Sequence, residues 1–77
     1  NPFNPSTVIS YTILAESFVE LKVFDILGRE VSTLVNGMQK AGTYKVNFNA
    51  ENLSSGVYFY RIKTDNLSSV KKMTFIQ

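Results

Sequence analysis

Few side chains in this sequence of 77 residues could carry out chemistry. It contains no cysteine and no histidine, which removes the thiol nucleophile, the usual general base and most ligands for transition metals. Oxygen ligands that suit a hard cation such as Ca²⁺ occur at short spacing in Asn47, Asn49, Glu51 and Asn52. Nothing in their spacing defines a loop like that of an EF-hand, and ordinary turn residues have the same composition. We therefore expect no catalytic residue, no bound metal and no cofactor, and we predict that the chain is not an enzyme.

The other polar features of the sequence are typical of a solvent-exposed surface and not of a reactive site. Two Asn-x-Ser sequons, at Asn52 and Asn66, fall in expected turns, which accounts for them without a glycan. The net charge is +2 and the lysines are spread over several segments, whereas a nucleic-acid-binding protein usually clusters its basic residues. No apolar run approaches the length of a membrane-spanning helix. We therefore predict neither a nucleic-acid partner nor a direct membrane span.

One adjacent basic pair, Lys71-Lys72, lies near Lys63 across the last expected hairpin. It has two interpretations: a solvated edge that protects the sheet from unwanted pairing, or a docking surface recognised by a partner. Two aromatic residues also have two interpretations. Phe24 and Phe59 have the outward parity of their strands, so they either fill space between neighbouring strands or, if both are exposed, form a contact patch for another protein.

The apolar pattern that must position these residues has a period of two, which is typical of strands with one face in a core. It is clearest at Val19, Leu21 and Val23, which alternate with polar residues. The last segment has apolar residues of both parities, with Met73 and Phe75 on one face, so a β-bulge is expected there. Strands are predicted at residues 6–14, 18–26, 29–35, 42–49, 57–64 and 68–76, with turns at 15–17, 25–28, 36–37 and 65–66.

Two of the turns have specific sequence signatures. In the hairpin at residues 25–28, Asp25 is suited to accept a hydrogen bond from the backbone amide two residues on, and Gly28 supplies a positive φ. The spacing of Leu53, Gly56 and Tyr58 matches a tyrosine corner, in which the hydroxyl turns back onto the preceding bend. Gly56 allows the tight backbone, and Leu53 is expected to close the end of the core.

These features predict an all-β fold, namely a small immunoglobulin-like antiparallel β-sandwich of about six to seven strands without a disulfide. A chain of this size buries only about 60% of its unfolded surface, so we expect a stability of a few kcal/mol. Pro2 and Pro5 hold the first residues extended, and residues 1–5 are interpreted as the end of an interdomain linker that precedes a domain at residues 6–77. We expect the chain to be the last domain of a longer polypeptide.

Five blocks of sequence resemble a known family. They are NPFNPST at residues 1–7, LKVFDILGREV at 21–31, AGTY at 41–44, LSSGVYFYR at 53–61 and KKM at 71–73. In this order they closely resemble the type A C-terminal sorting domain of type IX secretion cargo, which is similar to the immunoglobulin-like domain of flagellar hook-capping proteins. The resemblance covers essentially the whole chain, which makes it far more specific than any one turn motif.

The resemblance implies a sorting signal at the end of a protein from a Gram-negative bacterium. The Sec pathway carries such proteins to the periplasm, the outer-membrane translocon recognises the folded domain, and in many cargoes a cell-surface sortase removes it and attaches the cargo to lipopolysaccharide. The cargo is then secreted or stays at the cell surface. The expected contacts with the secretion machinery are Gly42, Tyr44, Gly56, Tyr58, Lys71, Lys72 and Met73, which match the family's sorting motifs, together with Lys63. Two segments depart from the family, since Ile76-Gln77 replaces a basic end and Asp65-Asn66 replaces a Gly-rich turn.

The residues alone leave two other functions open. A small domain with open sheet edges could self-associate by donating residues 4–14 as a strand to a neighbour, which would make it a homo-oligomeric subunit of a fibre or surface layer. A carbohydrate-binding accessory module would instead use exposed, coplanar aromatic rings from the set Phe18, Phe24, Phe59 and Phe75.

Overall fold

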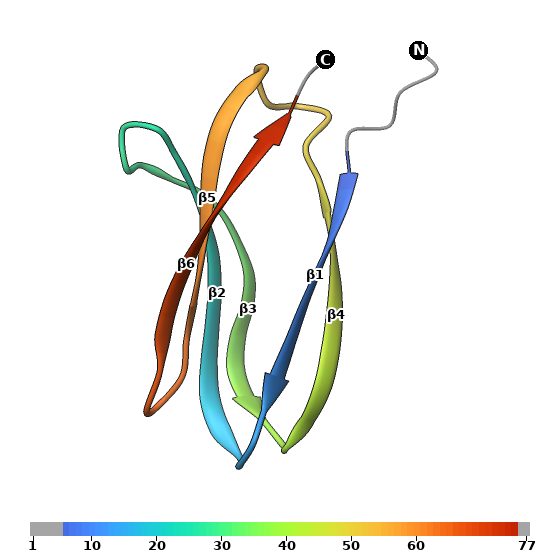
Figure 1. Ribbon diagram of the computed structural model, residues 1–77, viewed down its shortest axis with the longest axis vertical. Helices are drawn as coiled ribbons and strands as arrows, with labels where there is room; N and C mark the ends of the chain where they lie inside the picture. Colours follow the sequence, from blue (N-terminus) through green and yellow to red (C-terminus); the bar gives the residue numbers. More distant parts are fainter. Residues whose placement is uncertain (1–5, 76–77) are drawn as a thin grey trace.

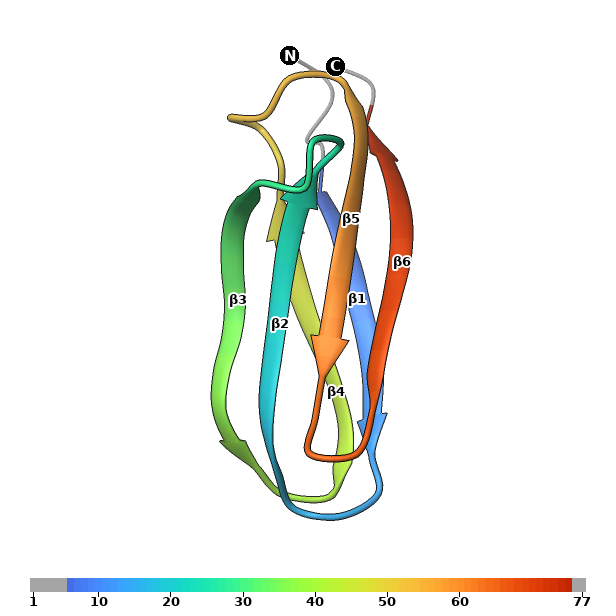
Figure 2. The ribbon, with the colours of Figure 1, turned by 90° about the vertical axis from the view of Figure 1, so that its left-hand side faces the viewer.

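Six antiparallel strands form two sheets in the computed structural model, which describes residues 6–75. The strands are β1 (Ser6–Ile13), β2 (Ser17–Asp25), β3 (Glu30–Gln39), β4 (Gly42–Asn49), β5 (Gly56–Lys63) and β6 (Ser68–Phe75). β1 pairs with β4 in a two-stranded sheet, and the other four strands lie in the order β3-β2-β5-β6. Figure 1 shows the two sheets as separate layers, and Figure 2 shows the four-stranded sheet in front of β1 and β4.

This strand order matches the immunoglobulin scheme. In that scheme strands B and E are neighbours in one sheet, while strands C′, C, F and G follow one another in the other. β1 and β4 take the places of B and E, and β3-β2-β5-β6 takes the places of C′-C-F-G. The predicted small antiparallel β-sandwich is therefore confirmed. Within residues 6–75, no strand lies on the outer side of β1, where the scheme has strand A.

The core lies between the two sheets, with β2 at its centre. Val19, Leu21 and Val23 are completely buried, because alternate residues of a strand point to the same face. β2 is hydrogen-bonded to β3 on one side and to β5 on the other, which places it in the interior of its sheet. Ile9 of β1 and Phe48 of β4 cover this face from the smaller sheet. The apolar alternation predicted for these strands is confirmed.

Phe75, near the end of the last strand, joins the two sheets. Its ring centroid lies 5.9 Å from that of Phe48 and 5.9 Å from that of Tyr58, in tilted arrangements favoured by aromatic pairs. Leu53 packs against the same cluster from the segment before β5, as predicted. This end of the sandwich is therefore closed by residues from β4, β5 and β6.

Two tyrosines fix the backbone by the same kind of hydrogen bond, from the hydroxyl to a carbonyl oxygen four residues earlier. The Tyr58 hydroxyl donates a hydrogen bond to the carbonyl oxygen of Ser54 at 2.8 Å, which confirms the predicted tyrosine corner. The Tyr44 hydroxyl donates to the carbonyl oxygen of Lys40 at 2.6 Å, and this second corner was not predicted. In both cases the residue two positions before the tyrosine is a glycine, with a φ of +152° or +153°, where a side chain would be strained.

The third strand is longer than predicted. The turn expected at Asn36-Gly37 is wrong, because β3 continues through these residues to Gln39 and stays paired with β2. Two register shifts in this ladder each place one extra residue in β3, and the pairing then runs on to Ser17 at the start of β2. The chain turns at residues 40–41 instead.

The bulge expected in the last strand is also absent. The ladder between β5 and β6 runs from Gly56 opposite Phe75 to Lys63 opposite Ser68 without a register shift. The apolar residues of both parities are accommodated because Val70 stays 59% exposed on the outer face. Ile76 and the predicted linker at residues 1–5 lie outside the described residues.

Replacing Tyr58 by Phe should lower the free energy of unfolding by about 1 kcal/mol, because the carbonyl oxygen of Ser54 loses its donor. Urea unfolding of the purified chain measures this change. Tyr60→Phe is the matched control, since the Tyr60 hydroxyl makes no hydrogen bond within residues 6–75. Equal stability of the Tyr58→Phe variant and the wild type would contradict a structural role for this hydroxyl.

Candidate functional site

The residues expected to contact a partner lie in three separate places. Five are close together on the β5–β6 hairpin: Gly56, Tyr58, Lys71, Lys72 and Met73. Gly42 and Tyr44 belong to β4 in the other sheet, and Lys63 pairs with Ser68 at the opposite end of the β5–β6 hairpin. Only the residues of the first group are therefore neighbours in the fold.

Lys71 and Lys72 project from opposite faces of the sheet. Lys72 lies opposite Phe59 on the outer face, whereas Lys71 lies opposite Tyr60 on the face that carries the core. Both lysines are exposed because β6 is the last strand of its sheet within the described part of the chain. The basic pair is thus not a single charged patch.

The motif tyrosines are engaged in structural contacts. Tyr58 is only 7% exposed, and its hydroxyl is bonded to backbone. The Tyr44 ring stacks on the Tyr11 ring with centroids 5.4 Å apart, and the Tyr11 hydroxyl donates to Gln39 Oε1 at 2.7 Å. Burial raises the pKa of the Tyr11 hydroxyl. Gly42, Tyr44, Gly56 and Tyr58 therefore have structural roles at the two tyrosine corners.

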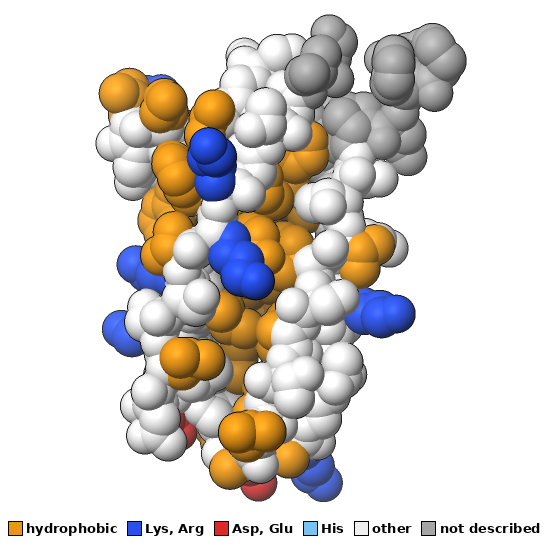
Figure 3. Space-filling view, viewed as in Figure 1, with side chains coloured by type: hydrophobic (Ala, Val, Ile, Leu, Met, Phe, Trp, Pro, Cys, Tyr) orange, Lys and Arg blue, Asp and Glu red, His pale blue; other side chains and the backbone are white. Residues whose placement is uncertain are grey.

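A furrow runs between β1 and β6, along the place where the immunoglobulin scheme has strand A. Its volume is about 430 Å³, and its lining includes Ile9 and Phe75 from the core together with Tyr60 and Met73. Figure 3 shows apolar side chains between the two strands. β1 pairs only with β4, and β6 only with β5, so the backbone edges on both sides of the furrow are unpaired within residues 6–75.

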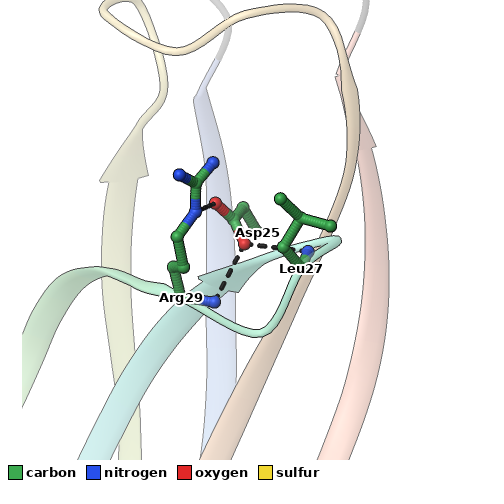
Figure 4. Close-up of polar contacts among 3 residues, drawn as sticks. All are labelled: Asp25, Leu27 and Arg29. Carbon is green, nitrogen blue, oxygen red and sulfur yellow. Dashed lines mark hydrogen bonds and ion pairs between the residues drawn. The ribbon is translucent and has the colours of Figure 1, made fainter.

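The tip of the β2–β3 hairpin is held by one carboxylate. Asp25 Oδ1 accepts hydrogen bonds from the backbone amides of Leu27 and Arg29, both at 2.9 Å, and Asp25 Oδ2 accepts one from Arg29 Nε at 2.7 Å (Figure 4). The bond from the Leu27 amide confirms the predicted contact two residues on, whereas the contribution of Arg29 was not predicted. Gly28 has the expected positive φ, at +83°.

The charge of Asp25 is stabilised by these contacts. The backbone amide of Arg29, the Arg29 side chain and the amide of Leu27 together hold the pKa of the Asp25 carboxyl below its ordinary value, although partial burial opposes them. The same tip exposes two aliphatic side chains, with Ile26 69% and Leu27 74% accessible to solvent.

Below the hairpin tip, aromatic and cationic side chains meet on the outer face of the large sheet. The Arg61 guanidinium lies over the Phe24 ring at 5.1 Å from its centroid, and Phe59 is directly opposite Phe24. Both rings are half-buried, so they are neither core residues nor a free aromatic platform. A shallow hollow of about 310 Å³ adjoins them and is also lined by Val70. Sequence reasoning missed Arg61, although its outward parity was visible.

The polar cluster considered as a cation site behaves as a turn. Asn49 Oδ1 accepts a hydrogen bond from the Glu51 amide at 2.9 Å, which caps the segment after β4. No three carboxylates come close enough to hold a metal ion within residues 6–75. Asn52 and Asn66, the two sequon residues, are exposed in turns. The described residues include no helix long and apolar enough to cross a membrane.

The sequence is similar to one known protein family. The model of the family described as "Secretion system C-terminal sorting domain" matches residues 1–77, which is the whole chain. Neither the curated proteins nor the solved structures contain a significant match.

Asp25→Asn should lower the melting temperature most near neutral pH, because a carboxyl with a lowered pKa contributes stability above its unfolded pKa and loses it as the pH falls through the folded value. The difference in Tm between variant and wild type should therefore shrink between neutral pH and about pH 2. Circular dichroism melting over this range measures it. Glu16→Gln is the control, since it removes an exposed carboxylate outside the hairpin. A difference independent of pH would exclude the charge of Asp25 as the cause.

Proposed function

Because the chain belongs to the family of secretion system C-terminal sorting domains, we propose that it is a non-catalytic signal recognised by the outer-membrane type IX translocon. The translocon exports the larger protein that carries the signal, after passage through the periplasm of a Gram-negative bacterium, and the cargo is released or kept at the cell surface. Where a sortase acts on the cargo, it removes this domain and attaches the cargo to the surface. The family match over the full chain supports the sorting role and the export of the cargo.

The furrow beside β6 is the observation that best supports a recognition surface. A partner that adds an extended strand can hydrogen-bond to the unpaired backbone of β6 and place alternate side chains on Met73 and Phe75. Such main-chain pairing tolerates different cargo sequences, because affinity comes from backbone groups that every sorting domain presents. Lys72 lines the furrow, and Lys71 lies next to it on the core-facing side of β6, so either lysine can fix the approach of the strand by a charge contact.

The role of the tyrosine corners follows from this mode of binding. Tyr58 pairs with Met73 across the β5–β6 ladder and packs on Phe75, so its anchored position determines where two lining residues of the furrow lie. Gly56 begins the same ladder opposite Phe75. The motif residues of this hairpin therefore act as positioning residues for the β6 edge.

A folded reporter that carries this chain at its C-terminus should be exported by a bacterium with a working type IX machinery, and one that lacks residues 71–77 should stay in the periplasm. Immunoblots of the periplasm, cell surface and medium measure the distribution. Export of the truncated reporter at the wild-type level would contradict the proposal.

The truncation also removes Phe75 from the core, so a variant that keeps the fold is required. Lys71→Glu reverses one exposed charge on the core-facing side of β6, next to the furrow, and we expect it to reduce export about fivefold or more through repulsion or loss of a charge contact. Lys45→Glu, on exposed β4, is the matched control and should leave export unchanged. Equal export of the two variants would exclude Lys71 from the recognition surface.

Self-association by strand donation is a second candidate function, favoured by the position beside β1 that no strand within residues 6–75 occupies. In this arrangement a strand of one copy fills the furrow of the next copy. Because such a head-to-tail contact need not close into a ring, its repetition gives a linear chain of subunits. Multi-angle light scattering of the isolated chain should then give a molar mass that rises with concentration. A monomer at every concentration rules this candidate out and leaves the sorting function untouched.

A further inference from the structure

The β2–β3 hairpin tip and the sheet face beneath it form a continuous exposed surface, here called the tip surface. It consists of Phe24, Ile26, Leu27, Phe59, Arg61 and Val70. Ile26, Leu27 and Val70 are 69%, 74% and 59% exposed, and the two half-buried phenylalanine rings lie between them. Single exposed aliphatic side chains are ordinary, but a contiguous group around a hollow marks a contact site.

The tip surface is separate from the furrow. Residues of alternate parity on a strand point to opposite faces, so Val70 and Lys72 face outward, whereas Met73 and Phe75 face the core and the furrow. Figure 3 shows apolar side chains at the hairpin tip in addition to those between β1 and β6. Lys72 also lines the furrow, but none of the six residues that define the tip surface does, so a partner in the furrow leaves those six accessible.

The hairpin tip is held rigid before any partner arrives. Three hydrogen bonds to Asp25 and the hydrogen bond from the Gly28 amide to the Asp25 carbonyl oxygen at 2.9 Å define its backbone. Ile26 and Leu27 are thus exposed on an ordered loop. Because the loop is already ordered, a partner would lose little free energy in immobilising it.

The charges of the tip surface are unbalanced. β5 and β6 contain Arg61, Lys63, Lys71 and Lys72 but no aspartate or glutamate. The nearest carboxylates have other partners: Asp25 binds Arg29, and Glu30 lies 3.3 Å from Lys22 and accepts a hydrogen bond from Thr33. The hydrogen bond from Thr33, followed by the contact with Lys22 and by the more distant charge of Arg61, lowers the pKa of Glu30.

Arg61 has no direct counterion within residues 6–75, since it makes neither an ion pair nor a hydrogen bond there and its buried Nε has no acceptor. The carboxylate whose charge acts on it is that of Glu30, which already pairs with Lys22. An unpaired buried donor costs free energy, and the contact of the guanidinium with the Phe24 ring offsets part of this cost. A guanidinium over an aromatic ring can still bind a carboxylate with its other N–H groups.

We propose that the tip surface binds a protein segment that carries a carboxylate next to apolar side chains, and that this segment belongs to the secretion machinery. The inference rests on the proposed sorting function. The carboxylate lies against Arg61 and Lys72, while the apolar side chains of the segment cover Phe59, Val70 and the hairpin tip. Charge complementarity favours an acidic partner, and the apolar area excludes recognition by charge alone.

Export of the reporter tests the proposal with paired substitutions. Val70→Glu places a negative charge within the tip surface, and we expect export to fall about fivefold or more. Leu67→Glu is the matched control, because Leu67 is 56% exposed at the other end of the same hairpin. It should be exported like the wild type. If the wild-type chain itself fails to direct export, the proposed sorting function fails; if the wild type and Val70→Glu are exported equally, only the tip surface fails.

Two further variants separate charge from folding. Lys72→Glu changes an exposed side chain opposite Phe59 and should reduce export while the circular dichroism melting curve stays that of the wild type. Lys45→Glu makes the same change on β4 and should have no effect. If Lys72→Glu melts normally and is exported normally, the carboxylate-binding role is overturned, whatever the stability of the Val70→Glu variant.

Photo-crosslinking identifies what lies on the surface during export. A photoreactive phenylalanine analogue at position 70 should crosslink to a segment of the machinery with an aspartate or glutamate within a few residues, and the same analogue at position 67 should not. Peptide mass spectrometry of the adduct gives the segment. A crosslink to a second copy of this chain, to a glycan or to a segment without a carboxylate would overturn the proposal.

Discussion

The structure depends on keeping one face of β2 away from water. Val19, Leu21 and Val23 are the three completely buried large side chains among the described residues, and the strands on both sides of β2 are held in place by pairing with it. A small chain without disulfides must offset its conformational entropy almost entirely through such burial. The sheet that contains β2 has four strands, however, and the sheet that covers it has two. The difference in width leaves the apolar face incompletely covered at β6, which is the physical origin of the furrow.

The Gly-x-Tyr motif occurs at both tyrosine corners. Each tyrosine returns a hydrogen bond to the carbonyl oxygen four residues earlier, and the glycine between them allows the backbone to turn there. Tyr58 also belongs to the buried core cluster, whereas the Tyr44 ring stacks on Tyr11. These structural roles hold whether or not a partner also touches the same residues.

Much of the fold could be predicted because its signals are local. The period of two identified every strand, and Asp25, Gly28, Gly56 and Tyr58 defined two turns through interactions within a few residues. The course of β3 could not be predicted, because its two extra residues are accommodated only by pairing with β2. Asn36-Gly37 has a strong local turn signature, and this tertiary pairing overrides it.

The candidate site was less predictable for the same reason. Arg61 and Phe24 are far apart in the chain, and only the register between β2 and β5 brings the guanidinium over the ring. The exposure of Val70 likewise depended on whether β6 contained a bulge. By contrast, the corner at Tyr44 repeats the spacing already recognised at Tyr58, so a comparison of the two motifs within the sequence could have revealed it.

The alternation of side chains along β6 limits how a partner can use the basic pair. Lys71 and Lys72 are adjacent in sequence, yet they project to opposite faces of the sheet, so a partner confined to the outer face reaches Lys72 but not Lys71. A strand added at the furrow meets Lys72, which lines it, and passes next to Lys71. A segment on the outer face meets Lys72 beside Arg61, whose Nε has no hydrogen-bond acceptor among residues 6–75. If both lysines contribute to recognition, the partner must therefore reach the furrow side of β6. An edge strand permits this, because its free edge leaves both of its faces accessible to a clamp.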